Sequence, residues 1–281
     1  LNAANAEHRL KWHVSLIQKW INENPVGAGN GWEPYPSSLR IVNWIKWFIE
    51  KQNSNNISQQ TFLDSLVIQT RFLSKNLEFH LLGNHLFSNA KALVYAGLFF
   101  TGKESDAWYK LGVSILKKEI SEQVLSDGGN FELSPMYHAI FLEDLLDLAN
   151  IHQAYEISLP SELRIKIEPM FAWLESMCHP DSDIAFFNDA TLGVSPSFGA
   201  LLSYAKRLGY VIKEKVPQNL IHLEASGYIR VENDDAVLIS DVANIGPDYL
   251  PGHGHADALS FELSLFNRVG FGGSPYRRRL E

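Results

Sequence analysis

The spacing of apolar residues changes near residue 220, and this change constrains the fold more than any other feature of the sequence. Up to about residue 215, apolar side chains recur three or four positions apart, which is the period of a helix with one buried face. In the segments 227–232, 236–243 and 258–266 the period falls to two, which is typical of strands. The sequence therefore predicts a helical domain over residues 1–220 and a β domain over residues 221–281.

Only a few strands fit between residue 221 and the last residue given. Asn233, Asp234 and Asp235 separate two of them and predict a hairpin turn. Because a small sheet is marginally stable by itself, we expect this one to pack on the helices or to be completed by further strands of a longer chain.

Composition limits the classes of partner. The 281 residues are 46% hydrophobic and 20% charged, as in globular proteins, and the formal net charge is -8. A general binder of nucleic acid or anionic membranes needs a broad basic surface, so we expect neither partner. We also expect no membrane span, because no run of about 20 apolar residues occurs. A single cysteine, Cys178, excludes an internal disulfide.

Two predicted helix starts carry residues suited to chemistry. Gly83 precedes Asn84, which lies where a helix N-cap would, and His85 then opens the helical run. A side chain at a helix start can face a cleft beside free backbone N–H groups, which favour anions, so Asn84 is a candidate for a functional role. A second interpretation is that Asn84 simply caps the helix through its side-chain oxygen.

The second helix start follows Ser134, a good N-cap, and Pro135, which suits the first helical position. Tyr137 and His138 then fall in the first turn, where the helix dipole favours a phenolate and so indicates a tyrosine base. A second interpretation is that the Tyr137 ring packs in the core with its hydroxyl hydrogen-bonded. Glu132, just before this helix, and Asp144, within it, are candidate carboxylate catalysts; a second interpretation is that both are merely solvated acids.

Aromatic residues and one arginine gather in residues 30–47. Trp32, Tyr35 and Arg40 suit a sugar that carries a carboxylate, because a ring stacks on the sugar face and a guanidinium pairs with the acid. Trp44 and Trp47 lie on a helical run and are expected in the core. We expect Trp32 and Tyr35 to be the more exposed pair.

The stretch PGHGHAD, residues 251–257, holds His253, His255 and Asp257. In an extended segment these three side chains would share one face, and together they could bind a divalent metal. A second interpretation is that Asp257 orients a histidine ring from behind.

Four stretches together carry a family resemblance: GWEPYPSSLRIVNW, GNHLFSNAKAL, GGNFELSPMYH and HGHADALSFEL, in this order from about residue 30 to 266. The chain resembles the heparinase II/III-like polysaccharide lyases, a group that includes oligo-alginate lyases. The resemblance implies a mainly α protein with a β part: an incomplete (α/α) toroid of helical hairpins, followed by part of an antiparallel β-sandwich.

The resemblance also implies β-elimination on a polysaccharide that contains uronic acid. A base removes the C5 proton, the C4–O4 bond breaks, and an acid protonates the departing O4. By similarity, Asn84 with His85 would hold the uronate carboxylate, and Tyr137 would be the base and also the acid. His253 would complete the catalytic residues from the β domain.

The same resemblance implies further substrate contacts and limits the cofactors. Residues expected to bind the substrate are Arg40, Trp32, Tyr35, Glu132 and His138. No cofactor is required, although His255 resembles a histidine that binds structural zinc in some relatives. Where those relatives supply a later acid ligand, this sequence reads RVGFGGSPYRRR. Two ligands do not make the usual four of structural zinc, so we expect the zinc site to be incomplete in this chain.

The expected partner is an acidic polysaccharide or oligosaccharide, in a periplasmic or secreted setting by the resemblance. The net charge of -8 favours a lightly charged uronate polymer, such as alginate, over a highly sulfated glycosaminoglycan. Two alternatives stay open. One is an (α/α)-toroid glycoside hydrolase that uses Glu132 and Asp189, and the other is a non-catalytic carbohydrate-binding protein of polysaccharide biosynthesis.

Overall fold

The computed structural model describes residues 3–51, 59–81, 83–213, 218–244, 252, 254–265 and 276–279. The chain divides into two compact units, Leu1–Leu116 and Lys117–Glu281. This division falls inside a helix and not near residue 220, so the predicted boundary between a helical and a β domain stays a prediction. No helix in the described ranges is long and apolar enough to cross a membrane.

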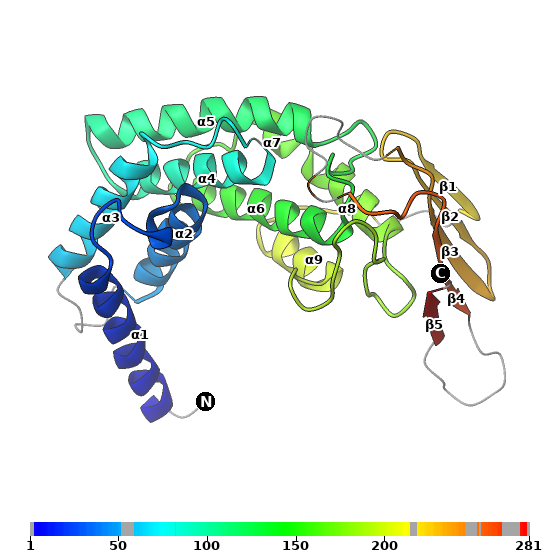
Figure 1. Ribbon diagram of the computed structural model, residues 1–281, viewed down its shortest axis with the longest axis horizontal. Coiled ribbons are helices and arrows are strands. Elements are labelled where there is room, and N and C mark those ends of the chain that lie inside the picture. Colours follow the sequence, from blue (N-terminus) through cyan, green and yellow to red (C-terminus); the bar gives the residue numbers. More distant parts are fainter. Residues whose placement is uncertain are drawn as a thin grey trace. The chain divides into compact units, whose positions relative to one another are not determined.

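The first unit is helical (Figure 1). Its elements are α1 (Ala3–Glu23), the 3-10 turn η1 (Asn30–Trp32), α2 (Pro34–Lys51), α3 (Gln59–Leu73), α4 (Gly83–Phe99) and the first part of α5 (Lys103–Gln123). Helix α4 packs on both α2 and α3. It is the central helix of this unit, because nearly all of its side chains from Leu86 to Leu98 are buried. A helix that is apolar all round belongs in a core.

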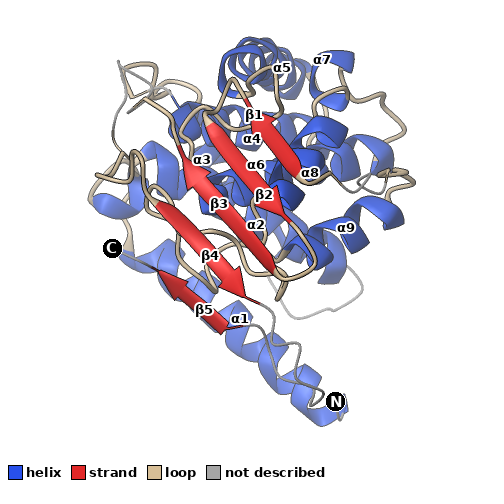
Figure 2. Ribbon diagram, turned by 90° about the vertical axis from the view of Figure 1, so that its right-hand side faces the viewer, coloured by secondary structure: helices blue, strands red, loops and turns tan. Residues whose placement is uncertain are grey.

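The second unit combines helices with an antiparallel sheet. Its further helices are α6 (Pro135–Ala154), α7 (Ser161–Arg164), α8 (Ile167–Ser176) and α9 (Phe198–Arg207). The strands are β1 (Leu220–Leu223), β2 (Tyr228–Glu232), β3 (Ala236–Asp241), β4 (Phe261–Leu265) and β5 (Tyr276–Arg279). Figure 2 shows them side by side in the order β1-β2-β3-β4-β5. Helix α6 packs on α7, α8 and α9.

One face of the sheet is buried and the other is not. The register places Tyr228 opposite Asp241 and Arg230 opposite Ile239, so these side chains share the inner face. Tyr228 and Ile239 there join the core cluster that includes Trp173 of α8. The outer face exposes Leu220 by 60% and Leu265 by 53%. The strict alternation of the strand sequences is therefore the signature of a sheet covered on one side.

The predicted strands are confirmed as β2, β3 and β4. The last begins at Phe261, not at residue 258, because a turn closed by the Ser260 N–H and the Asp257 carbonyl (2.8 Å) comes first. The predicted hairpin turn is also present, since the Asn233 side-chain oxygen accepts from the N–H groups of residues 235 and 236. Strands β1 and β5 were not predicted, because four residues are too few to show a period.

The Asp-Gly-Gly turn at residues 127–129 joins α8 to the sheet. The Asp127 carboxylate accepts hydrogen bonds from the backbone N–H (2.7 Å) and hydroxyl (2.9 Å) of Ser226. The Trp173 indole N–H also reaches the Ser226 hydroxyl, at 2.8 Å. Gly128 has a φ of +91°, and a Cβ there would lie 2.3 Å from the Pro169 carbonyl oxygen. Only glycine satisfies both the backbone angle and the close approach.

We expect Gly128→Ala to lower the free energy of unfolding by about 3 kcal/mol, because positive φ and overpacking add. Gly193→Ala is the matched control: Gly193 also has positive φ (+79°), but no atom lies within 4 Å of its Cβ position. It should lose only about 1 kcal/mol. Urea denaturation of both variants measures the difference, and equal losses would show that the Pro169 contact is unimportant.

Candidate active site

The predicted site residues are distributed over both units. The first unit carries Trp32, Tyr35, Arg40, Asn84 and His85, and the second carries Glu132, Tyr137, His138 and His255. His253 lies outside the described residues, so its catalytic role stays a prediction.

Helix α4 begins two residues earlier than expected, at Gly83 and not at His85. Gly83 is its first residue and has a φ of +54°, so Asn84 lies inside the first turn and not at the N-cap. Asn84 is partly exposed, and no hydrogen bond of its side chain occurs within the described part of the chain. Its amide therefore lies on the first turn of a long helix, where an anion-binding role would place it.

His85, the next residue, is held from two sides. Its ring stacks on Tyr35 of α2, with centroids 4.3 Å apart and planes 23° apart. Its Nδ1 lies 3.1 Å from Oε1 of Glu78, a buried carboxylate. Two separately predicted site residues, Tyr35 and His85, are thus brought together, whereas Glu78 was not identified from the sequence. A single glutamate in a loop gives no sequence signal that it will be buried beside a histidine.

Trp32 and Arg40 serve the packing of the first unit. Trp32 is only 4% exposed, and its indole N–H donates to the Asn24 carbonyl at 3.2 Å. The expectation of an exposed Trp32 ring is wrong, because η1 turns the ring inward against Trp20 and Phe72. Because the Trp32 ring is buried, it does not offer the exposed face that the predicted contact with a sugar requires.

The Arg40 guanidinium is likewise used internally. It donates to Gln69 Oε1 (2.7 Å) and to the Gly31 carbonyl (2.6 Å), and it lies 3.8 Å from the centroid of the Trp20 ring. Burial lowers the pKa of Arg40 to about 10. Arg40 thus fixes η1 to α2 and α3, and each of its three guanidinium nitrogens donates a hydrogen bond within the first unit, so its predicted contact with a sugar acid stays a prediction.

The start of α6 matches the prediction. Ser134 is the N-cap and Pro135 the first helical residue, so Tyr137 does lie in the first turn. The Ser134 hydroxyl makes no capping hydrogen bond and is buried without a partner in the described structure. Leu133 before it has a φ of +60°, and its carbonyl accepts a hydrogen bond from the Tyr228 hydroxyl at 2.7 Å. A strained residue held in this way sets the direction in which the helix begins.

The phenol of Tyr137 is not predisposed to ionise. Burial raises its pKa, and the charges of Asp189 and Glu132 raise it further. The expectation that the helix dipole would favour a phenolate is therefore wrong for this structure, because desolvation and two carboxylates outweigh the dipole. At neutral pH Tyr137 is a proton donor, and it can act as a base only after it has lost that proton.

Asp189 belongs to a turn in which two residues have positive φ, Asn188 (+50°) and Asp189 (+60°). The Asn188 N–H donates to the Asp257 carboxylate at 2.9 Å, and the Asn188 side-chain oxygen accepts from the His255 N–H at 3.1 Å. Asp257 therefore holds this turn, and its role in orienting a histidine ring stays a prediction, because His253 lies outside the described residues. Asn188 was missed, although asparagine is one of the few residues that tolerate this backbone region.

The described residues do not assemble a metal site. His255 forms an ion pair through Nε2 with Asp189, and no group of three or more His, Cys, Asp or Glu side chains in the described ranges is arranged to hold a metal ion. Structural zinc ordinarily has four protein ligands, and the described residues bring no such set together.

His138 and Glu132 are both buried, against the prediction that they contact the substrate. His138 Nδ1 accepts from the Asn130 N–H (3.1 Å), its Nε2 donates to the Met170 carbonyl (2.9 Å), and its ring stacks on Trp173. Burial lowers the pKa of His138 to about 4. His138 thus links α6 to α8 as a neutral imidazole.

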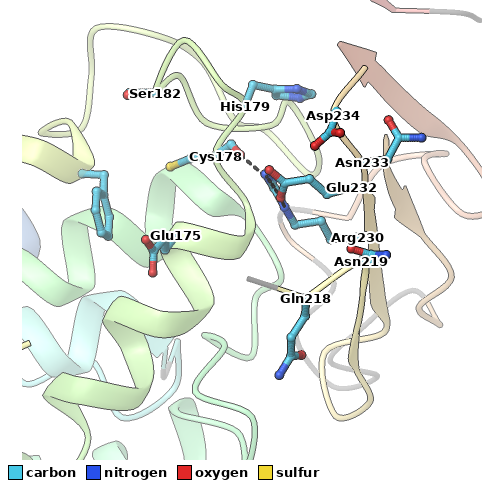
Figure 3. A pocket seen from close by; sticks show the side chains of 11 residues that line it. Glu175, Cys178, His179, Ser182, Gln218, Asn219, Arg230, Glu232, Asn233 and Asp234 are labelled. Atoms are coloured by element: carbon cyan, nitrogen blue, oxygen red, sulfur yellow. Dashed lines mark hydrogen bonds and ion pairs between the residues drawn. The ribbon is translucent and has the colours of Figure 1, made fainter. Parts of the chain in front are cut away.

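A polar pocket of about 470 Å³ lies elsewhere in the second unit (Figure 3). Arg230 enters it from β2 and donates to the Cys178 carbonyl (2.6 Å) and to the Glu232 carboxylate (2.9 Å). Among the predicted site residues that the structure describes, none lines this pocket. It is therefore separate from the residues predicted to perform the chemistry.

Sequence comparison identifies the class of protein. Residues 2–206 match the family model described as Heparinase II/III N-terminus, and residues 215–269 match Heparinase II/III-like, C-terminal. The chain therefore belongs to the heparinase II/III family, and the resemblance based on the four stretches is confirmed.

Three curated relatives carry the name heparin-sulfate lyase. The protein from Bacteroides stercoris is 35% identical over 218 residues, which cover 68% of this chain and 32% of that protein. The protein from Pedobacter heparinus is 30% identical over 202 residues, with coverages of 67% and 30%. The chain spans about a third of the length of these relatives.

Solved structures confirm the fold class. A crystal structure of heparinase III matches with a TM-score of 0.77 at 24% identity, covering 92% of this chain and 45% of that chain. A heparan sulfate lyase from Pedobacter heparinus gives 0.63 at 23% identity, with coverages of 91% and 43%. The predicted class, helices of the toroid type followed by an antiparallel β part, is thus that of its structural neighbours.

The burial of His138 predicts a loss of stability in acid. Its pKa is about 4 in the folded protein and near 6.5 when exposed, so between these values only the unfolded chain binds the proton. Stability must therefore fall as the pH falls through this window, by about 2 kcal/mol between pH 7 and pH 5 for this residue alone.

The measurement is the free energy of unfolding against pH for the wild type, His138→Gln and His222→Gln. Glutamine at 138 keeps a donor for the Met170 carbonyl but does not titrate, so this variant should lose less stability on acidification. His222 is exposed and is the matched control. Parallel pH curves for the wild type and His138→Gln would contradict the assignment.

Proposed function

We propose that this protein is a polysaccharide lyase that cleaves a uronate-containing glycosaminoglycan of the heparan sulfate type by β-elimination. Membership of the heparinase II/III family supports the reaction class, and the names of the curated relatives support the substrate class. The observation that carries the proposal is the placement of Asn84 and His85 on the first turn of α4 and of Tyr137 on the first turn of α6.

The chemistry assigns a role to each of these residues. The amide of Asn84 and the ring of His85 neutralise the uronate carboxylate, which makes the C5 proton acidic. Removal of that proton forms the C4–C5 double bond and breaks the C4–O4 bond. Tyr137 transfers protons. Its neutral phenol suits protonation of the departing O4. Because its pKa is raised, it can act as a base only after the phenol has lost its proton.

The substrate class differs from the one that net charge favours. A formal charge of -8 favours a lightly charged polymer, whereas the matched relatives are named for heparin sulfate. Net charge describes the whole surface, and binding depends on the local potential at the site. We therefore propose a heparan-type polymer in place of alginate.

The hydrolase alternative receives less support. Hydrolysis needs an accessible acid and base, but Glu132 is buried. Asp189 is exposed and forms an ion pair with His255. The binding-protein alternative keeps the same surfaces and differs only in the absence of turnover.

We expect the 281-residue chain to produce an ultraviolet absorbance gain with heparan sulfate, because β-elimination creates a double bond conjugated to the carboxylate. A neutral polymer such as dextran is the control and should give no gain. New reducing ends without absorbance would indicate hydrolysis, and binding without any new reducing ends would indicate a carbohydrate-binding protein.

We expect Tyr137→Phe to lower kcat by about 10² to 10⁴-fold while binding of the polymer is retained, because only proton transfer needs the hydroxyl. Tyr155→Phe is the matched control, since Tyr155 caps the other end of the same helix and is partly exposed. Initial rates from product absorbance and affinity from calorimetry separate the two effects. A fully active Tyr137→Phe variant would remove Tyr137 from the mechanism.

A further inference from the structure

Glu78 is a carboxylate whose contacts are all made inside the first unit. It is 5% exposed, and a buried carboxylate is costly unless hydrogen bonds compensate it. Its Oε2 accepts from Asn89 Nδ2 at 2.9 Å, and its Oε1 lies 3.1 Å from His85 Nδ1. Both carboxylate oxygens therefore have a partner on α4.

The direction of each hydrogen bond around Glu78 follows from one backbone group. The Glu78 N–H donates to Asn89 Oδ1 at 2.9 Å, which fixes the Asn89 amide with its nitrogen toward Glu78 Oε2. The same nitrogen donates to the Ser38 hydroxyl at 3.0 Å, and that hydroxyl donates onward to the Pro34 carbonyl at 2.8 Å. These hydrogen bonds thus connect α4 to the start of α2, and in each of them a donor faces an acceptor.

An ionised carboxylate only accepts hydrogen bonds. The remaining contact of Glu78, through Oε1, therefore requires a proton on His85 Nδ1. The stack on Tyr35 fixes the plane of the ring, which leaves Nε2 as the ring nitrogen without a partner within the described residues. In the neutral ring Nε2 is an acceptor, and in the protonated ring it becomes a donor for an anion.

We propose that Glu78 is a positioning residue for His85: it holds the proton on Nδ1 and orients the ring so that Nε2, when the ring is protonated, donates to the substrate carboxylate. The effect of Glu78 on catalysis rests on the proposed function. The hydrogen bond that orients the His85 ring does not depend on it. Glu78 also compensates the positive charge when a protonated His85 binds the uronate carboxylate.

The substitution Glu78→Gln tests whether Glu78 determines which nitrogen of the His85 ring carries the proton. Because Asn89 Nδ2 must still donate, the oxygen of the new amide must face Asn89 and its NH₂ must face His85. The NH₂ group donates to Nδ1, so Nδ1 must lose its proton and the ring must change to the Nε2–H form. Side-chain ¹⁵N NMR at about pH 8, where an ordinary histidine is neutral, reports which nitrogen is protonated. His85→Gln assigns the resonance.

We expect a protonated Nδ1 in the wild type and in Glu78→Asp, and a protonated Nε2 in Glu78→Gln. On heparan sulfate, Glu78→Gln should lower kcat/KM by about 10- to 100-fold, with partial rescue in Glu78→Asp. Glu119→Gln is the matched control, because Glu119 is a buried glutamate of α5 that pairs with Gln123. It should leave the His85 spectrum unchanged.

The outcomes separate the inference from the proposed function. An unprotonated Nδ1 in the wild type overturns the inference without any variant, even if Glu78→Gln does not fold. A folded Glu78→Gln variant with the wild-type spectrum overturns it as well. If the spectra behave as expected but no uronate polymer is cleaved, the lyase proposal fails while the geometric role of Glu78 stands.

Discussion

The hydrogen bond from the Tyr228 hydroxyl to the Leu133 carbonyl is the interaction on which the arrangement of the second unit depends most. It joins the inner face of the sheet to a residue with left-handed backbone just before α6. Asn188 donates to the same two residues, so one turn, one strand and one helix start meet at this point. Tyr137 is placed by this meeting point, because it lies four residues after Leu133 on a rigid first turn. Backbone strain of this kind persists only where the surroundings determine it fully.

Buried polar groups divide the predicted site residues into two kinds. Each nitrogen of the Arg40 guanidinium and of the His138 ring makes a hydrogen bond inside the protein, and burial shifts the pKa of each residue toward its neutral form. The Asn84 amide and the His85 Nε2, by contrast, have no hydrogen-bond partner in the described structure. Residues of the first kind stabilise the fold, and those of the second kind have polar atoms with which a ligand can form hydrogen bonds. Residue type alone does not distinguish them, since both kinds lie in stretches that carry the family resemblance.

Periodicity and capping rules predicted the elements well, because they depend on local physics. The change of period near residue 220 anticipated the sheet, and Ser134 followed by Pro135 anticipated the start of α6. The errors arose where distant residues decide. Burial and the charge of Asp189, which is 52 positions away from Tyr137, changed the expected direction of its pKa. Glu78 was overlooked for the same reason, because its importance comes from packing beside α4. No local pattern contains that information.

The one-sided burial of the sheet has a practical consequence. Leu220, Val231 and Leu265 place sizeable apolar surface on the outer face of a folded molecule. Dyes such as ANS, whose fluorescence rises on hydrophobic surface, are commonly read as reporters of partly unfolded states. For this chain such a dye would already find a binding surface on the native sheet. A fluorescence signal with that probe would therefore describe the outer face of the sheet as much as any loss of structure.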